Sequence, residues 1–374
     1  MPKSHVIVRG IAKIEPPTDR PHIELLRSSI TPVNVTFVDG QTAQLDPGDP
    51  RFALHAKILT ELRRVGLPVY AEVESDSRKI TTLLIPLQGR VVAILRDPAG
   101  DFAFELDNSA KSFALRSGHR KCRQYVKVLQ KAQLDGVPVL VTESAAGYEI
   151  VDIRRVENPR EPALLANAAM APALRAAAVS PVTLEQVGKM FALVASYSCG
   201  ILDPTDPCIP FLYPDNGCHA RAQEMCSRIQ ASGILEADQQ PAKVWNYSRD
   251  RAHPLVVKTS NVPMCELRWR FHVAVALEVQ ATGEQGTQML VLDPALFPGG
   301  PVPVATWQDE QHAPDSCLVY TSPDPYLPPA PFGVETDPGN KKTDQELTRY
   351  RLLLEQRVAE AGPPPYECPG NKAR

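Results

Sequence analysis

The sequence predicts an α+β protein in which two small, similar units of mixed α and β structure precede a larger domain. Three observations carry this prediction. Helix and strand patterns at 58–85 recur at 128–155, a helical pattern begins at the cysteine at position 218, and apolar strand patterns follow at 271–279 and 288–293. At roughly 100 to 200 residues per domain, the chain length of 374 residues predicts two or three domains.

The composition argues against two classes of protein. Hydrophobic residues make up 43% and charged residues 22%, and the formal net charge of -3 comes without a basic block, which argues against a nucleic-acid binder. No window approaches the ~18 to 20 unbroken apolar residues of a membrane span. Histidines and carboxylates do not cluster at metal-ligand spacing, and no glycine-rich loop follows a strand. We therefore expect no metal or other cofactor. We also expect a monomer.

An internal repeat organises the first 156 residues. "ILTELRRVGLPVYAEVESDSRKITTLLI" (58–85) aligns without a gap with "VLQKAQLDGVPVLVTESAAGYEIVDIRR" (128–155). Each copy has the pattern of a helix, a Gly-x-Pro turn and two strands. Further strand patterns precede each helix, at 33–38 and 43–46 in the first copy and at 91–97 and 102–107 in the second. The sequence thus predicts a duplicated ββαββ unit, with one copy over 1–86 and the other over 87–156.

The segment 157–179 is rich in alanine, and prolines interrupt its helical pattern. It is either a linker that a protease can cut or a short helix packed on a domain face. A domain over 180–330 follows, and a C-terminal helix and tail occupy 331–374. The helix is predicted at 343–361, and its apolar stripe is expected to pack on the body of the protein rather than on a partner. The stripe consists of Leu347, Tyr350, Leu354 and Val358.

The domain over 180–330 begins with an amphipathic helix capped by Ser180 or Thr183. A loop containing Cys199 and Cys208 leads to a second helix at 218–232. Strands are predicted near 243–247, 255–259, 271–279 and 288–293.

Cys218 is the first candidate for chemistry. It follows Asp-Asn-Gly in "FLYPDNGCHARAQEM" (211–225), at the first turn of the predicted helix. Unpaired N–H groups at a helix N-terminus favour the thiolate form of a cysteine there. Asp215 or Asn216 can cap the helix, and Gly217 allows a substrate carbonyl to approach the backbone. A structural role for this cysteine stays open on these residues alone.

A base and an orienting carboxylate follow on strands. His272 shares one face of its strand with the small residues Ala274 and Ala276, which leave room for a cysteine or a substrate. Asp293 ends the next strand, directly before Pro294, where a carboxylate can reach a histidine on the neighbouring strand. The structural alternatives are that His272 is a residue of the core and that Asp293 is a turn residue.

A helix-borne cysteine facing a histidine and an aspartate on an antiparallel sheet is the papain-like and transglutaminase-like arrangement. In such a triad the thiolate attacks an acyl carbon, the imidazole moves the proton, and the carboxylate orients the imidazole. Cys218, His272 and Asp293 are therefore the predicted catalytic residues.

The stretch 180–325 resembles the bacterial protein-glutaminase (protein-glutamine deamidase) family. Four blocks in order carry the resemblance, and they are "SCGILDPTDPCIPFLYPDNGCHARAQEM", "WRFHVAVAL", "VLDPALFPGGPV" up to Trp307, and "YTSPDPY" from Tyr320. The resemblance implies Cys218 as nucleophile, His272 as general base and Asp293 as orienter. It also implies a Cys199–Cys208 disulfide and deamidation of glutamine in protein or peptide substrates through a cysteine thioester.

The segment 124–150 is similar to the pro-region of these enzymes, an inhibitory segment that proteolysis removes. The resemblance therefore implies a proenzyme, an activating protease and secretion. The first copy of the repeat departs from the family, and the N-terminus has no continuous apolar stretch of a signal peptide. We expect a secreted protein whose leader is removed or that leaves by another route, with a cytoplasmic location as the alternative.

Three alternative functions agree with parts of this interpretation. A transglutaminase or a peptidase uses the same triad with a different acceptor or target. The N-terminal half can instead be a permanent binding domain over a silent cysteine. An injected deamidase effector toxin would explain the elaborated N-terminal half.

Four further residues have predicted positions. Trp245 and Trp269 are candidates for the wall of a substrate cleft, although core packing is the favoured interpretation. His219 is expected to point away from the nucleophile and to be non-catalytic. Cys226 is expected to face the core or to pair with Cys265 or Cys317.

Overall fold

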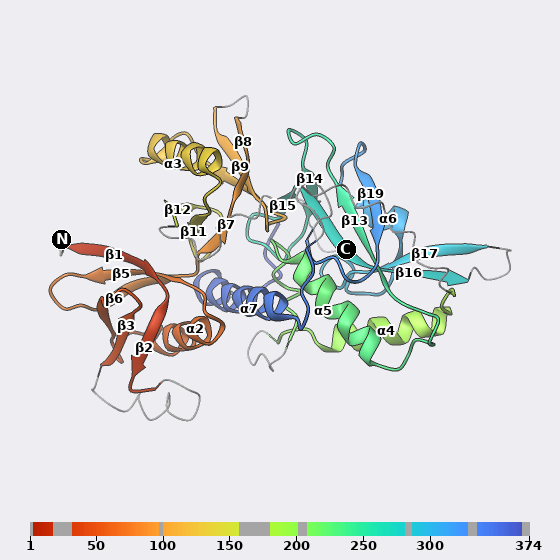
Figure 1. The fold of residues 1–374 in the computed structure, drawn as a ribbon, viewed down its shortest axis with the longest axis horizontal. Coiled ribbons are helices and arrows are strands. Elements are labelled where there is room, and N and C mark those ends of the chain that lie inside the picture. The colour runs from red at the N-terminus through yellow and green to blue at the C-terminus, as the bar shows by residue number, and fades with distance from the viewer. Residues whose placement is uncertain are drawn as a thin grey trace.

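The computed structural model describes residues 3–17, 32–96, 100–156, 180–200, 208–280, 286–327 and 335–368. The linker predicted at 157–179 lies outside these residues. Figure 1 shows the first N-terminal unit at the left, the second above it and the third, larger part at the right. The mixed α and β character that the sequence predicts is confirmed.

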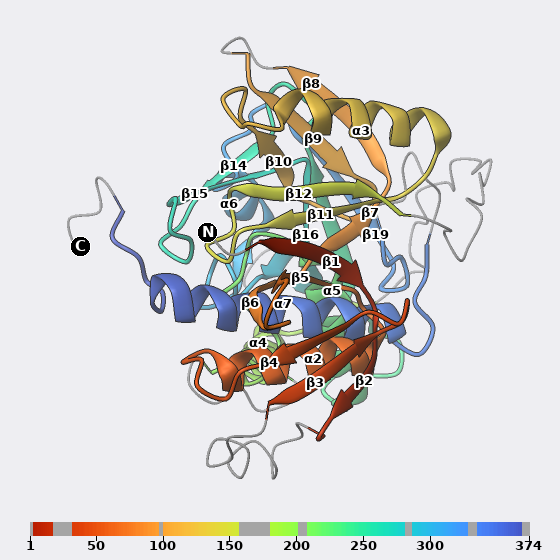
Figure 2. The same ribbon diagram turned by 90° about the vertical axis from the view of Figure 1, so that its left-hand side faces the viewer.

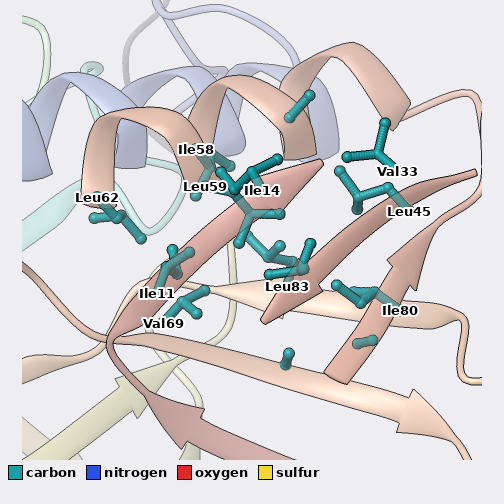
Figure 3. Packing of buried hydrophobic residues seen from close by; sticks show 14 of the residues in the cluster. Ile11, Ile14, Val33, Leu45, Ile58, Leu59, Leu62, Val69, Ile80 and Leu83 are labelled. Carbon is teal, nitrogen blue, oxygen red and sulfur yellow. The ribbon is translucent and has the colours of Figure 1, made fainter. Parts of the chain in front are cut away.

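The first unit packs one helix against two three-stranded antiparallel sheets, β1-β5-β6 and β2-β3-β4. Its elements are β1 (Ser4–Arg9), β2 (Ile11–Glu15), β3 (Val33–Phe37), β4 (Thr42–Leu45), α2 (Phe52–Val65), β5 (Val69–Glu74) and β6 (Ile80–Leu84). Figure 3 shows Ile58, Leu59 and Leu62 of α2 facing the strand side chains across a continuous apolar core. Gly66 ends the helix at φ 73°, a conformation that glycine adopts without strain.

The second unit has the same plan, with sheets β12-β11-β7 and β10-β9-β8. Its elements are β7 (Leu87–Gly89), β8 (Val91–Arg96), β9 (Phe102–Leu106), β10 (Ser112–Leu115), α3 (Cys122–Asp135), β11 (Val139–Glu143) and β12 (Ile150–Arg155). The helix and the two strands after it begin 70 residues after their counterparts, from 52 to 122, 69 to 139 and 80 to 150.

The predicted ββαββ order was incomplete. Each unit has four strands before its helix, β1 to β4 in one and β7 to β10 in the other. The strands predicted at 43–46 and 102–107 are therefore not counterparts, because the strand equivalent to β4 is β10. Strands of three to six residues give only two or three alternations each, which is too little for the period of two to be recognised.

The third part is built on a five-stranded antiparallel sheet in the order β18-β17-β16-β13-β19. Its elements, with the C-terminal helix, are α4 (Leu184–Ser196), α5 (Cys218–Ala231), β13 (Ala242–Tyr247), β14 (Leu255–Lys258), β15 (Glu266–Trp269), β16 (Phe271–Gln280), β17 (Thr287–Leu292), β18 (Val302–Pro303), α6 (Val304–Asp309), β19 (Cys317–Thr321) and α7 (Lys341–Ala361). The strand expected at 271–279 is thus β16.

The two faces of β16 contact different elements, as its alternation predicts. Val275 and Leu277 pack against α4 and α5 on one face. Ala274 and Ala276 pack with Trp307 of α6 on the other. Thr183 caps α4 through a capping box with Gln186, which confirms one of the two predicted caps.

The helix α7 contacts both α2 of the first unit and α5 of the third part. Figure 1 shows it running between these parts of the molecule, and Figure 2 shows its length from the side of the first unit. Tyr350 and Leu354 of its predicted stripe pack with Tyr213 of the third part. Leu352, however, lies in the core of the first unit, so the helix has a second apolar face that the sequence analysis missed.

Two disulfides link the third part, Cys199–Cys208 and Cys265–Cys368. Of the two alternatives for Cys226, the core position is confirmed and the pairing with Cys265 or Cys317 is wrong, because Cys226 is a free, buried residue facing the core on α5. The tail carrying Cys368 returns to Cys265 over a separation of 103 residues, which local spacing cannot reveal.

We expect thiol counting to give four reactive cysteines in denatured, non-reduced protein and eight after reduction. The structure has four free cysteines, at 122, 218, 226 and 317, and two disulfides. Intact-mass measurement after alkylation gives both counts. Six or eight reactive thiols without reductant would contradict the pairing.

Candidate active site

Cys218 is the first residue of α5 and is 2% exposed. Gly217 is the N-cap residue, at φ 76°, and no side chain caps the helix. The prediction that Asp215 or Asn216 caps it was therefore wrong. The Asn216 side chain accepts from the N–H of Gly217 at 2.9 Å, while Asp215 bonds to the C-terminal helix. Gly217 is needed for its positive φ and because a Cβ there would clash with the ring of Tyr350.

His272 and Asp293 meet as the sequence order suggested. Nε2 of His272 lies 2.7 Å from Oδ2 of Asp293, and both side chains are buried. His272 is the second residue of β16, and Asp293 directly follows the neighbouring strand β17. Trp307 donates its indole N–H to the same carboxylate oxygen at 2.9 Å. These two bonds fix the carboxylate beside the imidazole.

The His272 ring lies between two indoles. Trp269 stacks on it at a centroid distance of 4.4 Å, and Trp307 lies 5.4 Å away. Nδ1 has no conventional hydrogen-bond partner among the described residues, and the Cys218 thiol is the group beside the ring. One ring nitrogen thus faces the carboxylate, and the other is left for the thiol.

The electrostatics of the pair favour an imidazolium and a carboxylate. Burial lowers the pKa of His272, but the Asp293 carboxylate and the contact with Cys218 outweigh this and raise the pKa to about 9. Burial raises the pKa of Asp293, yet His272 and Trp307 hold that pKa below its ordinary value. Such an arrangement can take a proton from a thiol and return it to a leaving group.

The two tryptophans singled out in the sequence are both buried. Trp269 contacts the site directly through its stack on His272. Trp245 donates to Thr321 at 3.0 Å and packs in the same apolar cluster as Cys218. The exposed fractions are 0% for Trp245 and 1% for Trp269 with the N-terminal units in place.

His219 lies beside the nucleophile in sequence and takes no part in its hydrogen bonds. Its ring meets Tyr326 edge-on at 5.0 Å, and its nitrogens have no hydrogen-bond partner among the described residues. Burial lowers its pKa to about 3, so the imidazole is neutral.

A segment of the second unit contacts the residues around Cys218. Ala110 packs in the apolar cluster that contains Cys218, and its N–H donates to Asn216 Oδ1 at 3.0 Å. The N–H of Arg270 donates to the carbonyl of Ala110 at 2.9 Å. The Arg270 guanidinium donates to the carbonyl oxygens of Ser109 and Asp107 at 2.9 and 2.6 Å.

Sequence reasoning missed these partners of the site. In the sequence, Trp307 stands out only as part of the blocks that carry the resemblance, and Asn216 stands out only as a possible helix cap. Arg270 follows an alternating pattern as one more strand residue, although the strand is broken there between β15 and β16. The alternation does not show that break, so the sequence carries no signal for the role of Arg270.

Among the described residues, no cluster of three or more histidine, cysteine, aspartate or glutamate side chains has the arrangement of a metal site. None of the helices in the described ranges has the length and apolar character to cross a membrane.

Residues 187–311 match the protein-family model described as Glutaminase. The fold is similar to a crystal structure of pro-protein-glutaminase, with 19% identity and a TM-score of 0.49, over 70% of this chain and 90% of that chain. The protein-glutaminase of Chryseobacterium proteolyticum has 25% identity and a TM-score of 0.37, over 44% of this chain and 85% of that chain. No curated protein sequence matches the chain.

The matched range contains the whole of α5, β16 and β17, and with them every residue of the Cys218–His272–Asp293 group. The part of the chain that is similar to the Glutaminase model is therefore the part that carries this group.

Proposed function

We propose that this protein deamidates glutamine side chains of proteins and peptides to glutamate and releases ammonia. The observation that carries the proposal is the buried Cys218–His272–Asp293 group at the start of α5 within the range that matches the Glutaminase model. We propose a papain-like or transglutaminase-like cysteine hydrolase for this domain, and the position of the cysteine on a helix with its partners on an antiparallel sheet supports this.

The chemistry uses the thiolate of Cys218 as nucleophile. It adds to the γ-carboxamide carbon, and backbone N–H groups at the start of α5 stabilise the oxyanion. His272 gives its proton to the nitrogen, the C–N bond breaks, and ammonia leaves a thioester behind. His272 then takes a proton from water, the hydroxide adds to the thioester carbon, and the C–S bond breaks to give glutamate and the free thiolate.

The N-terminal half is proposed to be a duplicated pro-region that keeps the enzyme inactive. The segment 107–111 supports this, because Ala110 packs in the same apolar cluster as Cys218 and Arg270 bonds to the carbonyl oxygens of this segment. Lys111 also forms an isolated antiparallel bridge with Trp269, the residue stacked on His272. A substrate cannot reach Cys218 while this segment is docked. Cleavage by a protease in 157–179 is proposed to begin activation.

The protein is proposed to work in an oxidising compartment, as a secreted enzyme. The two disulfides support this, because such bonds persist outside the reducing cytosol. Recovery of the oxidised chain from the medium of the producing cells, with none in the cytosol, is the expected result of fractionation.

The function is tested by measuring ammonia release from a glutamine-containing dipeptide and from a denatured protein after the N-terminal units have been removed. Parallel reactions contain an amine donor, to detect crosslinking, and are followed by gel electrophoresis, to detect chain cleavage. Ammonia with neither product is expected. Crosslinking would make the protein a transglutaminase, cleavage would make it a peptidase, and no product would contradict an enzymatic function.

Trp307→Phe is expected to lower kcat/KM about 10- to 100-fold, since a hydrogen bond to a charged group contributes ~1.5–3 kcal/mol. The substitution removes the indole N–H bonded to Asp293 and keeps an aromatic ring beside His272. Without that donor the pKa of Asp293 rises, so the acidic limb of the pH–rate profile moves to higher pH. An unchanged profile would show that this bond does not tune the carboxylate.

A further inference from the structure

The carboxylate of Asp215, three residues before the nucleophile, is buried and bonded to the C-terminal helix. Its two oxygens accept hydrogen bonds from the guanidinium of Arg357 on α7, at 2.7 and 2.8 Å. Both side chains are fully buried, with exposed fractions of 1% and 0%. Tyr148 of the second unit donates to the same carboxylate at 3.0 Å. We call residues 213–217, directly before Cys218, the nucleophile loop. The two hydrogen bonds form a two-point ion pair between this loop and a helix outside the matched range 187–311.

The backbone of Asp215 connects the pair to the histidine. Its carbonyl oxygen accepts from the indole N–H of Trp269 at 2.9 Å. Trp269 in turn stacks on His272 at 4.4 Å. Asp215 therefore contacts α7 through its side chain. Through its backbone it contacts Trp269, which stacks on His272, and Cys218 follows three positions later at the start of α5.

A second contact from α7 acts on the same loop. The Tyr350 ring lies where a Cβ of residue 217 would be, so it packs directly against Gly217. Tyr350 also stacks on Tyr213 at the start of the loop, at 5.7 Å. The guanidinium of Arg357 lies over the Tyr213 ring, 4.2 Å from its centroid. One helix thus holds the loop at its beginning and immediately before the nucleophile.

The energetics favour a positional role for the pair. Burial raises the pKa of Asp215, but Arg357 outweighs this and holds the pKa below its ordinary value, so the carboxylate is charged. A buried ion pair often contributes no more stability than apolar residues of the same size, whereas it does specify one geometry. A bidentate arginine–carboxylate pair fixes both distance and orientation.

The proposed activation makes Arg357 more important. Tyr148 lies in the second unit and leaves Asp215 when the N-terminal units leave. Among the described side chains bonded to this carboxylate, Arg357 is then the one that stays. An enzyme gains little from a nucleophile that is misplaced by about 1 Å, since such a shift can cost ~100-fold in rate.

We infer that Arg357 is a positioning residue for the reaction, and that through Asp215 the helix α7 sets the place of Cys218 relative to His272. The inference rests on the proposed function for its reaction. It gives Arg357, on the C-terminal helix, a role in placing the nucleophile.

The test is Arg357→Lys, which keeps the charge but cannot form the two-point pair. Ammonia release is measured with the full chain after removal of the N-terminal units. We expect kcat to fall about 10- to 100-fold, while KM stays within about threefold because the substrate-binding surface is unchanged. If this variant does not fold, the double variant Asp215→Asn with Arg357→Gln removes both charges together and takes its place, with the same expected split.

Arg349→Lys is the matched control. Arg349 is also buried on α7, but it pairs with Glu346 of its own helix and makes no hydrogen bond to the nucleophile loop. We expect it to lower the melting temperature as much as Arg357→Lys does and to leave kcat within about twofold of the wild type.

A second readout does not depend on activity. In the full-length chain, the titration of His272 is followed by histidine side-chain NMR and assigned with His272→Gln. The pKa of His272 is raised to about 9, in part by the contact with Cys218. Displacing the thiol in Arg357→Lys is expected to lower this midpoint by about one unit.

The outcomes separate the two proposals. If the wild type releases ammonia, a kcat for Arg357→Lys within twofold of wild type overturns the inference, and so does an equal loss in Arg349→Lys. If the wild type releases no ammonia, the proposed function fails, and the His272 midpoint decides the positioning alone. A midpoint that falls supports it, and an unchanged midpoint overturns it.

Discussion

Cys218→Ala is expected to abolish ammonia release, with a loss of at least about 10⁴-fold, because nucleophile removal eliminates the covalent path and leaves only binding and oxyanion stabilisation. The residue opens α5 beside the His272–Asp293 pair, and the reaction has no other thiol in that cluster. The measurement is ammonia release from a glutamine dipeptide by protein freed of its N-terminal units.

Cys226→Ala is the matched control for this loss. Cys226 is a buried free cysteine on the same helix, and burial raises its pKa to about 11, so it stays a neutral thiol. The same substitution there removes the same sulfur atom and costs packing without touching the proposed chemistry. Ammonia release is expected to stay within about threefold of the wild type once the folded fraction is equal. Equal losses in both variants would mean that the cysteine at 218 is structural.

Cleavage confined to 157–179 is expected to leave the two halves associated and nearly inactive, and removal of the N-terminal units is expected to raise ammonia release about 100-fold or more. Such a factor corresponds to an open state populated at ~1% in the nicked complex. The expectation follows from α7, which belongs to the C-terminal half and packs into the core of the first unit.

The contacts between α7 and the first unit are both apolar and polar. Leu352 is 2% exposed within the apolar cluster of that unit. Gln356 donates to the carbonyl of Leu83 at 2.7 Å, and Lys57 pairs with Glu355 at 2.8 Å. These bonds hold the first unit after the linker is cut, and the first unit keeps segment 107–111 close to Cys218 at a high effective concentration.

Size-exclusion chromatography of the nicked protein tests this directly. We expect one peak that contains both fragments after the first cut. We expect the fragments to separate, and ammonia release to appear, after a second digestion. Leu352→Asp should release the fragment after the first cut, because it places a charge in that core. Free fragments and full activity after the first cut in the wild type would show that α7 does not retain the N-terminal half.

Local patterns in the sequence predict the candidate site. The three residues at the centre of the site follow recognisable local rules, a cysteine at a helix start and polar residues on and after apolar strands. The helices α4, α5 and α7 and the strand β16 also lie where periodicity predicts them. These features depend on neighbours within a few residues, and the backbone period records them directly.

The short strands were less predictable. β7 has three residues, and β10 has four. A strand of this length is stabilised by its partner in the sheet, and the partner cannot be identified from the strand itself. The number of strands in each N-terminal unit was therefore decided by pairing, for example of β7 with β11.

The sequence by itself determined the longer helices and strands, the order of cysteine, histidine and aspartate, and the repeat with its offset. Tertiary structure alone decided what surrounds them. The Arg357–Asp215 pair spans 142 positions, and the bond from Ala110 to Asn216 spans 106. Such contacts leave no period in the sequence, because each depends on folding that brings distant segments together. The buried charges and the covered nucleophile are therefore properties of the assembled chain and not of any one of its segments.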